Sequence, residues 1–275
     1  MQVLIGFVIA LIVGLTGVGG GSFTTPALVL LAGISGAEAV GTALVFAAVV
    51  RLVAAPFYVV GKQVHLRHLG LMLLGAVPGI LGGTYLLRIA NAQLSNPLLL
   101  TVIGAMLIVS ATLTALQTDP RNKPEPDRAS PWLAWLALPI GIETGFSSSG
   151  AGAMGTLLLF NFSGLPAAQV VGTDLLFGTA LASVGALFHF SFGTISSAVL
   201  KALLLGGIPG VLIGCALAPR VPSHRLRKAI LLLTLLLGFE LLVTGARSLL
   251  GSGAARAEKN STRSPQAFSD RSRCP

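Results

Sequence analysis

The chain has 275 residues, of which 53% are apolar, 34 are glycine and only 10% are charged. Soluble domains carry about 25% charged residues, so this composition, with a mean hydropathy of +0.86, excludes an ordinary soluble domain and predicts an integral membrane protein. The net charge of +9 is scattered over short loops and a basic tail, which suits an anionic membrane surface and argues against nucleic-acid binding. We expect an all-α, multi-pass protein of the cell (inner) membrane, surrounded by the lipid bilayer.

Each half of the chain is expected to contain a long interrupted apolar element followed by three transmembrane helices. In the first half these elements cover 3–33, 38–60, 68–88 and 96–116. In the second half they cover 132–163, 167–190, 198–218 and 226–247. The predicted boundaries are a first transmembrane repeat at 3–116, a polar linker at 117–130, a second transmembrane repeat at 131–247 and a basic, disordered tail at 248–275.

The two halves match each other in one ungapped register. A shift of 131 residues aligns the VGT at 40–42 with the VGT at 171–173, and the Pro-Gly at 78–79 with the Pro-Gly at 209–210. This coincidence predicts an internal duplication, as in many secondary transporters. If each interrupted element is a re-entrant hairpin, the halves are inverted repeats, and if each element crosses the membrane fully, the halves are parallel.

Both interruptions lie in the middle of their apolar runs, at LTGVGGGS (15–22) and GFSSSGAG (145–152). A continuous helix of about 30 residues would be about 45 Å long, beyond a hydrocarbon core of about 30 Å. Each glycine would also cost the helix about 1 kcal/mol. We therefore predict two half-helices that meet at an unwound turn. Unwound backbone at membrane depth must face protein or a water-filled pathway.

These turns are candidates for binding an anion. The second half-helix of each element exposes backbone N–H groups at a positive dipole end, and serine and threonine hydroxyls add donors. The alternative is that the small residues only allow close helix packing. The candidate substrate-binding residues are Thr16, Gly17, Gly19, Gly20, Gly21, Ser22, Ser147, Ser148, Ser149, Gly150 and Gly152 at the turns, with Arg51, Thr42 and Thr173 on the helices that follow.

Ionisable residues inside the predicted spans are expensive and therefore candidates for function. One hypothesis is that Arg51 helps to hold an anion while Asp174 or Glu143 takes up a proton for coupling. The alternative is a buried ion pair between Arg51 and a carboxylate. His65 and His68 follow a basic loop and are expected to contact lipid headgroups. No catalytic triad, metal-ligand cluster or nucleotide motif stands out, so we expect no enzyme, no metal and no cofactor.

Several stretches resemble the TauE/SafE family, the sulfite exporter or TSUP group of bacterial membrane permeases. They are GLTGVGGGSFTTPAL at 14–28, AVGTALVF at 39–46 and GAVPGILGG at 75–83, with the second-half echoes VVGTDLLF and GGIPGVLIGCAL. The second half departs from the family pattern in carrying SSSGAG where a fuller glycine turn is expected.

The resemblance implies a transporter of small sulfur-containing or organic anions, such as sulfite or sulfonates, across the cytoplasmic membrane. We expect it to work by alternating access around a midplane site. A small-anion channel, or a non-transport membrane enzyme or assembly factor, is the alternative. The expected partner is a small anionic substrate, and homo-oligomerisation is left open.

Overall fold

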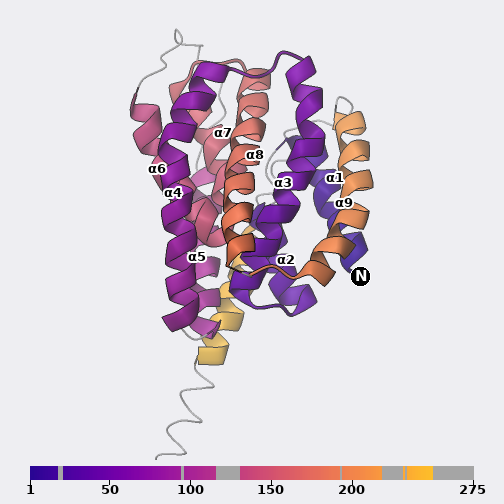
Figure 1. Cartoon of the computed structure of the whole chain (residues 1–275), viewed down its shortest axis with the longest axis vertical. Coiled ribbons are helices and arrows are strands. Elements are labelled where there is room, and N and C mark those ends of the chain that lie inside the picture. The colour runs from indigo at the N-terminus through magenta and orange to yellow at the C-terminus, as the bar shows by residue number, and fades with distance from the viewer. Residues whose placement is uncertain are drawn as a thin grey trace, which may run out of the picture.

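The computed structural model in Figure 1 is a bundle of helices. It describes residues 1–17, 21–93, 96–115, 131–192, 194–218, 232 and 234–249, and within these ranges every regular element is helical and no strand occurs. The predicted all-α class is confirmed. The predicted linker at 117–130 and nearly all of the predicted tail lie outside the described residues. The helices are α1 (Gln2–Thr16), α2 (Gly21–Ala32), α3 (Gly36–Val60), α4 (Leu66–Gln93), α5 (Asn96–Ala115), α6 (Trp132–Ser147), α7 (Gly150–Phe162), α8 (Ala167–Ser191) and α9 (Ser197–Leu217), followed by a helix at 234–249.

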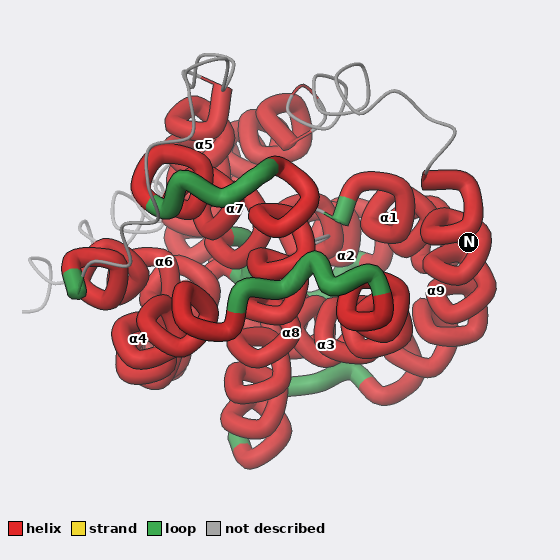
Figure 2. The backbone as a smooth tube through the Cα atoms, turned by 90° about the horizontal axis from the view of Figure 1, so that it is seen from above, coloured by secondary structure: helices red, strands yellow, loops and turns green. Residues whose placement is uncertain are grey.

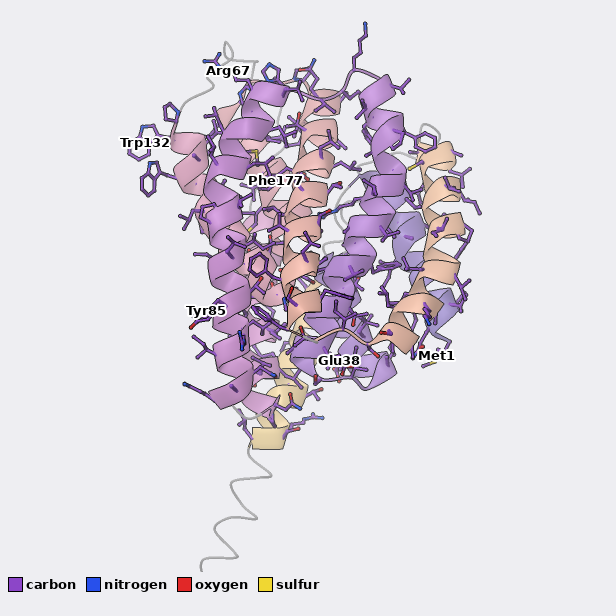
Figure 3. All side chains as sticks on the ribbon, viewed as in Figure 1. Met1, Glu38, Arg67, Tyr85, Trp132 and Phe177 are labelled. Atoms are coloured by element: carbon purple, nitrogen blue, oxygen red, sulfur yellow. The ribbon has the colours of Figure 1, made fainter. Side chains whose placement is uncertain are left out.

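Five of these helices, α3, α4, α5, α8 and α9, are long and apolar enough to cross a membrane. Figure 3 places Arg67 near the upper end of the bundle and Glu38 near the lower end, while Tyr85 and Trp132 point outward from its side. Phe177 lies in the interior, where it is fully buried. Charges at the ends, apolar and aromatic side chains on the outside and a packed interior are the distribution expected of a multi-pass membrane protein.

The interrupted elements are hairpins that enter the bundle from opposite ends. α1 runs parallel to α9, because Gly6 lies against Leu203 and Gly14 lies against Val211. α6 runs parallel to α4 in the same way, and α3 runs antiparallel to α8. α1 therefore rises from the lower end in Figure 1, and α2 returns to that end, where α3 begins. α6 descends from the upper end, and α7 returns there to meet α8. The structure thus has the re-entrant arrangement of the two that the sequence left open.

Glycine allows the pairs α1–α9 and α4–α6 to pack with their backbones in contact. Seen from above, α4 and α6 lie together on one side and α1 and α9 on the other, with α3 and α8 between them (Figure 2). Each glycine of a regular series faces a backbone carbonyl of the neighbouring helix, and a Cβ there would overlap that carbonyl. The series is Gly75, Gly79 and Gly83 on α4, and Gly206, Gly210 and Gly214 on α9.

Candidate functional site

Both hairpins reverse at left-handed residues. α1 ends at Gly17, with φ 66°, and α6 ends at Ser148, with φ 64°. A left-handed serine is uncommon, because its Cβ crowds the backbone there. The α7 backbone is also non-helical at Ala151 and Gly152, where φ of Gly152 is 117°. The predicted unwound turns are confirmed for the described residues; Gly19 and Gly20 lie outside them.

The tips of the two hairpins are joined by hydrogen bonds inside the protein. The Ser22 hydroxyl donates to the Ser149 carbonyl oxygen at 3.4 Å, and the Ser148 hydroxyl donates to the Gly21 carbonyl oxygen at 3.2 Å. The Thr25 hydroxyl lies 2.6 Å from the Ser148 hydroxyl. All five residues are buried. Two segments more than 120 residues apart in the chain therefore converge, and in this conformation each satisfies polar groups of the other.

Glu143 lies beside the second turn, as its position before the serines implied. Its carboxylate oxygen Oε1 accepts a hydrogen bond from the Ser149 hydroxyl at 2.9 Å, and its carbonyl oxygen accepts one from Ser147 at 3.0 Å. The hydroxyls of Ser147 and Ser149 lie 2.7 Å apart. Gly150 follows this turn and fits against the Ile140 carbonyl oxygen. The serine cluster thus holds a buried carboxyl group next to the point where the hairpins meet.

Arg51 reaches from α3 to the break in α7. Its side chain is only 2% exposed, and its Nη2 donates to the Ala151 carbonyl oxygen at 2.7 Å. The guanidinium occupies the space beside Gly178 of α8, where a Cβ would overlap Nη1. Arg51 thereby satisfies a carbonyl group that the unwound backbone leaves without a helical partner.

Asp174 lies on the same face of α8, one helical turn before Gly178. The carboxyl group is 1% exposed, and its Oδ2 lies 2.6 Å from the Thr156 hydroxyl of α7. Arg51 and Asp174 interact electrostatically, but no direct ion pair joins them. Arg51 Nε and Asp174 Oδ1 are both buried without a hydrogen-bond partner in the described part of the chain. The structure therefore brings the two groups into one cluster without the direct pairing that was the alternative to a functional role.

The threonines of the two VGT motifs lie elsewhere and cap helices. Thr42 Oγ1 accepts the backbone N–H of Ser196 at 3.0 Å, just before α9, and Thr173 Oγ1 accepts that of His65 at 2.9 Å, just before α4. Thr16 likewise makes a local bond, donating to the Ile12 carbonyl oxygen at 2.7 Å. In this conformation these three candidate residues stabilise helix ends and turns.

Comparison with known proteins identifies the family. The profile described as "Sulfite exporter TauE/SafE" matches residues 2–241, nearly the whole helical part of the chain. The chain belongs to the TauE/SafE family. It is 29% identical over 250 residues to the "Probable membrane transporter protein YjnA" of Bacillus subtilis (strain 168), and the match covers 87% of this chain and 98% of that protein. No solved structure matches the chain significantly. The family resemblance inferred from the motifs is confirmed, and the chain is a member of a membrane transporter family.

Two polar residues of this TauE/SafE site were not among the candidates. Thr25 follows the first glycine turn in SFTTPAL, and Thr156 follows the second turn. Thr156 lies four residues after Gly152 and donates to its carbonyl oxygen at 2.7 Å. A threonine one helical turn beyond a break is the signal that could have identified both, because its hydroxyl can reach the backbone groups that the break exposes.

The expectation for His68 was wrong. Its ring is fully buried, and its Nδ1 lies 2.8 Å from Nδ1 of His65. Because α4 begins at Leu66, the two imidazoles are separated by one helical turn and approach each other rather than lipid headgroups. No group of three or more metal-binding side chains occurs among the described residues.

Proposed function

We propose that this TauE/SafE protein is a secondary transporter that moves small anions across the cytoplasmic membrane by alternating access. The substrates we infer are sulfite, sulfonates or related sulfur-containing or organic anions. The observation that carries the proposal is the meeting of two re-entrant hairpins, entered from opposite ends, beside the buried cation Arg51. A site between broken helices near the middle of the bundle is the arrangement that secondary transporters use.

We further propose that the hairpins belong to two inverted repeats, at 3–116 and 131–247. The equivalent contacts support this. Gly79 of α4 faces the Leu138 carbonyl on α6, and Gly210 of α9 faces the Phe7 carbonyl on α1. Both members of the second pair are related to the first by the shift of 131 residues. In such a fold each repeat lends its hairpin to the last helices of the other repeat, so a movement of one half is felt at both hairpin tips.

The chemistry of the tips suits an oxyanion. Separation of the hairpins would free the hydroxyls of Ser22, Thr25 and Ser148 and expose the amino-terminal ends of α2 and α7. Each helix end supplies about half a positive charge, and Arg51 supplies a full one. A bound anion would therefore exchange the polar contacts between the hairpins for contacts to itself. In this proposal the bonds between the tips are those of the closed, substrate-free state.

Coupling to protons would assign roles to the buried carboxyl groups. We propose that Asp174 or Glu143 takes up a proton when the anion is carried. A neutralised carboxyl group lowers the cost of moving a negative charge through the bilayer, because burial of an uncompensated charge is expensive. Both carboxyls lie next to the α7 break, so either can respond to a ligand that binds there.

Transport assays separate this function from its rivals. Cells that lack and cells that overproduce the protein would be compared for uptake and efflux of labelled sulfite, thiosulfate and sulfonates. We expect a saturable flux that accelerates when unlabelled anion is present on the opposite side. A channel would give conductance without such exchange, and a membrane enzyme or assembly factor would give no protein-dependent flux. Equal fluxes in both strains for every anion would refute transport of these compounds.

A further inference from the structure

The contacts of Thr156 require one more hydrogen than its hydroxyl carries. Its Oγ1 lies 2.6 Å from Asp174 Oδ2 and 2.7 Å from the Gly152 carbonyl oxygen. A carbonyl oxygen and an ionised carboxylate are both acceptors, and a threonine hydroxyl has only one proton to give. Separations of about 2.5–3.0 Å between oxygens are typical of O–H···O bonds that contain a hydrogen. Two hydrogens are therefore needed for the two contacts.

A proton on Asp174 supplies the second hydrogen. Asp174 then donates from Oδ2 to Thr156, and Thr156 donates to the Gly152 carbonyl oxygen at the break in α7. Glu143 has a weaker need for the same correction, because the longest of its network's three contacts, from Ser147 to the Glu143 carbonyl, is 3.0 Å. If that contact contains no hydrogen, the two remaining contacts share the two serine protons. The shortage is thus sharper at Asp174.

The surroundings of Arg51 agree with a neutral Asp174. The guanidinium bonds to the Ala151 carbonyl rather than to the carboxyl group, and its Nε is buried without a partner among the described residues. An ionised carboxylate one helical turn away would be expected to draw Arg51 into a direct ion pair, because buried charges are costly unless they are paired. A neutral acid exerts no such attraction and leaves the positive charge available.

We propose that Asp174 carries the coupling proton in this conformation, that Thr156 positions it, and that the transported anion neutralises Arg51. The inference rests on the proposed transport function and chooses Asp174 over Glu143 as its proton carrier. One proton and one monovalent anion bind together. When the proton leaves for the opposite side, the Asp174 carboxylate compensates Arg51 and the anion is released. Transport of a monoanion is then electroneutral symport with one proton.

Thr156 serves both states of Asp174 because its hydroxyl can turn. It accepts a hydrogen bond from the acid and donates one to the carboxylate, and bonds to the charged form are the stronger. Without the hydroxyl, the carboxylate loses more than the acid, so the proton is held more tightly. Thr156 is therefore a positioning residue that eases proton release.

Other ionisable groups around α8 are engaged or distant. α7 contains none, and α3 contributes Arg51 as the charge that interacts with Asp174. On α6, Glu143 is bonded to Ser149, and on α4, His68 is bonded to His65. His189, on α8 itself, is bonded to Thr194 at the far end of the helix. The pH response of the cluster is thus assigned to Asp174.

The test uses the full-length chain in liposomes with labelled methanesulfonate and labelled sulfite as probes. Methanesulfonate keeps a single negative charge throughout the working pH range, so its pH dependence reports on the protein. Flux is driven either by a pH gradient or by a potassium diffusion potential. We expect wild-type methanesulfonate uptake to follow the pH gradient and to be insensitive to the potential. If only sulfite is moved, the comparison is between wild type and Asp174→Asn, since speciation of sulfite affects both equally.

Variants separate coupling from folding. Asp174→Asn, a fixed neutral group, should lose the response to the pH gradient and become driven by the potential. Thr156→Val should move the pH of half-maximal flux upward by about one unit, and Thr156→Ser should restore it. Thr112→Val is the matched control, because Thr112 makes the same helical bond, to the Ile108 carbonyl at 2.7 Å, on an exposed face of α5. It should leave the profile unchanged.

The outcomes distinguish the two proposals. If neither anion is moved by the wild type, the proposed function fails. If an anion is moved but its flux follows the potential and ignores the pH gradient, the function stands and the proton inference is overturned. An Asp174→Asn protein that still responds to the pH gradient like the wild type would also overturn it. So would a Thr156→Ser variant that folds and transports but fails to restore the profile lost in Thr156→Val.

Discussion

Thr42 Oγ1 accepts a hydrogen bond from the backbone N–H of Ser196 at 3.0 Å, across two segments 154 residues apart. The equivalent bond joins Thr173 to His65, shifted by 131 residues at both ends and exchanged between the halves. The glycine before each threonine faces the same loop, Gly41 against the Thr194 carbonyl and Gly172 against the Gln63 carbonyl. The VGT motif therefore holds the start of α9 or α4 against the central helices.

Replacing Thr42 or Thr173 by Val should reduce stability rather than substrate affinity. Loss of a side chain that caps a helix entry costs about 0.5–2 kcal/mol. We expect a lower denaturation temperature in detergent for Thr42→Val and a wild-type value for Thr42→Ser, which keeps the hydroxyl. The check is thermal denaturation alongside the KM for anion uptake. A raised KM at unchanged stability would instead return these threonines to the substrate site.

Glycines in contact between helices should be far less replaceable than glycines that face outward. A Cβ on Gly79 would overlap the Leu138 carbonyl, whereas nothing lies within 4 Å of a Cβ on Gly82. Overpacking a tight contact costs about 1–3 kcal/mol. Gly79→Ala should therefore lower the thermal stability, and the same change at Gly210 on α9 should do so too.

Gly82→Ala is the matched control on the same helix, and alanine should there be neutral or mildly stabilising because it favours helix. Thermal denaturation of the purified variants gives the comparison. Equal stabilities of Gly79→Ala and Gly82→Ala would contradict the close packing of α4 on α6.

The hairpin tips must separate during transport, so a covalent link between them should stop it. The hydroxyls of Thr25 and Ser148 lie 2.6 Å apart, which brings their Cβ atoms within reach of a disulfide. In a background with Cys215 and Cys274 replaced by serine, the pair Thr25→Cys and Ser148→Cys should lose most anion flux on oxidation and regain it on reduction. Each single cysteine variant is the control. Undiminished flux through a protein shown to be cross-linked would contradict a moving contact at the tips.

Sequence patterns were sufficient for the helices and for the existence of the turns, because both follow from local chemistry. Apolar length fixed α3, α4, α8 and α9 to within a few residues, and glycine and serine in mid-run located the breaks at Gly17 and Ser148. Partners could not be predicted in the same way. That Arg51 meets the Ala151 carbonyl, 100 residues away, depends on how the hairpins insert between the helices of the opposite half.

The roles of individual polar residues were also beyond a single sequence. Thr42 and Thr173 share a motif and looked like lining residues, yet their bonds are to loops of the other half. Histidines near a basic loop suggested the membrane surface, yet His68 turns inward to His65. A motif records that a residue type is needed at a position, whereas its function depends on long-range contacts that periodicity does not encode.

Arg51 and Gly178 should act as one unit in anion binding. The guanidinium fills the space that the missing side chain of Gly178 leaves, so Gly178→Ala should displace it from the Ala151 carbonyl. If the anion binds this guanidinium, Gly178→Ala and Arg51→Lys should each raise the KM for anion uptake about tenfold, the loss of one hydrogen bond to a charged group. The double variant should be little worse than either single one, because both remove the same interaction.

Uptake kinetics in liposomes measure these changes, with Gly70→Ala as the control, since a Cβ at Gly70 meets nothing within 4 Å. Multiplication of the two effects in the double variant would show that Gly178 acts independently of the guanidinium. A wild-type KM in Arg51→Lys would remove Arg51 from the site. The dependence on a shared space is what separates a positioned charge from a charge that is merely buried, because only a positioned charge is sensitive to a single added methyl group on the facing helix.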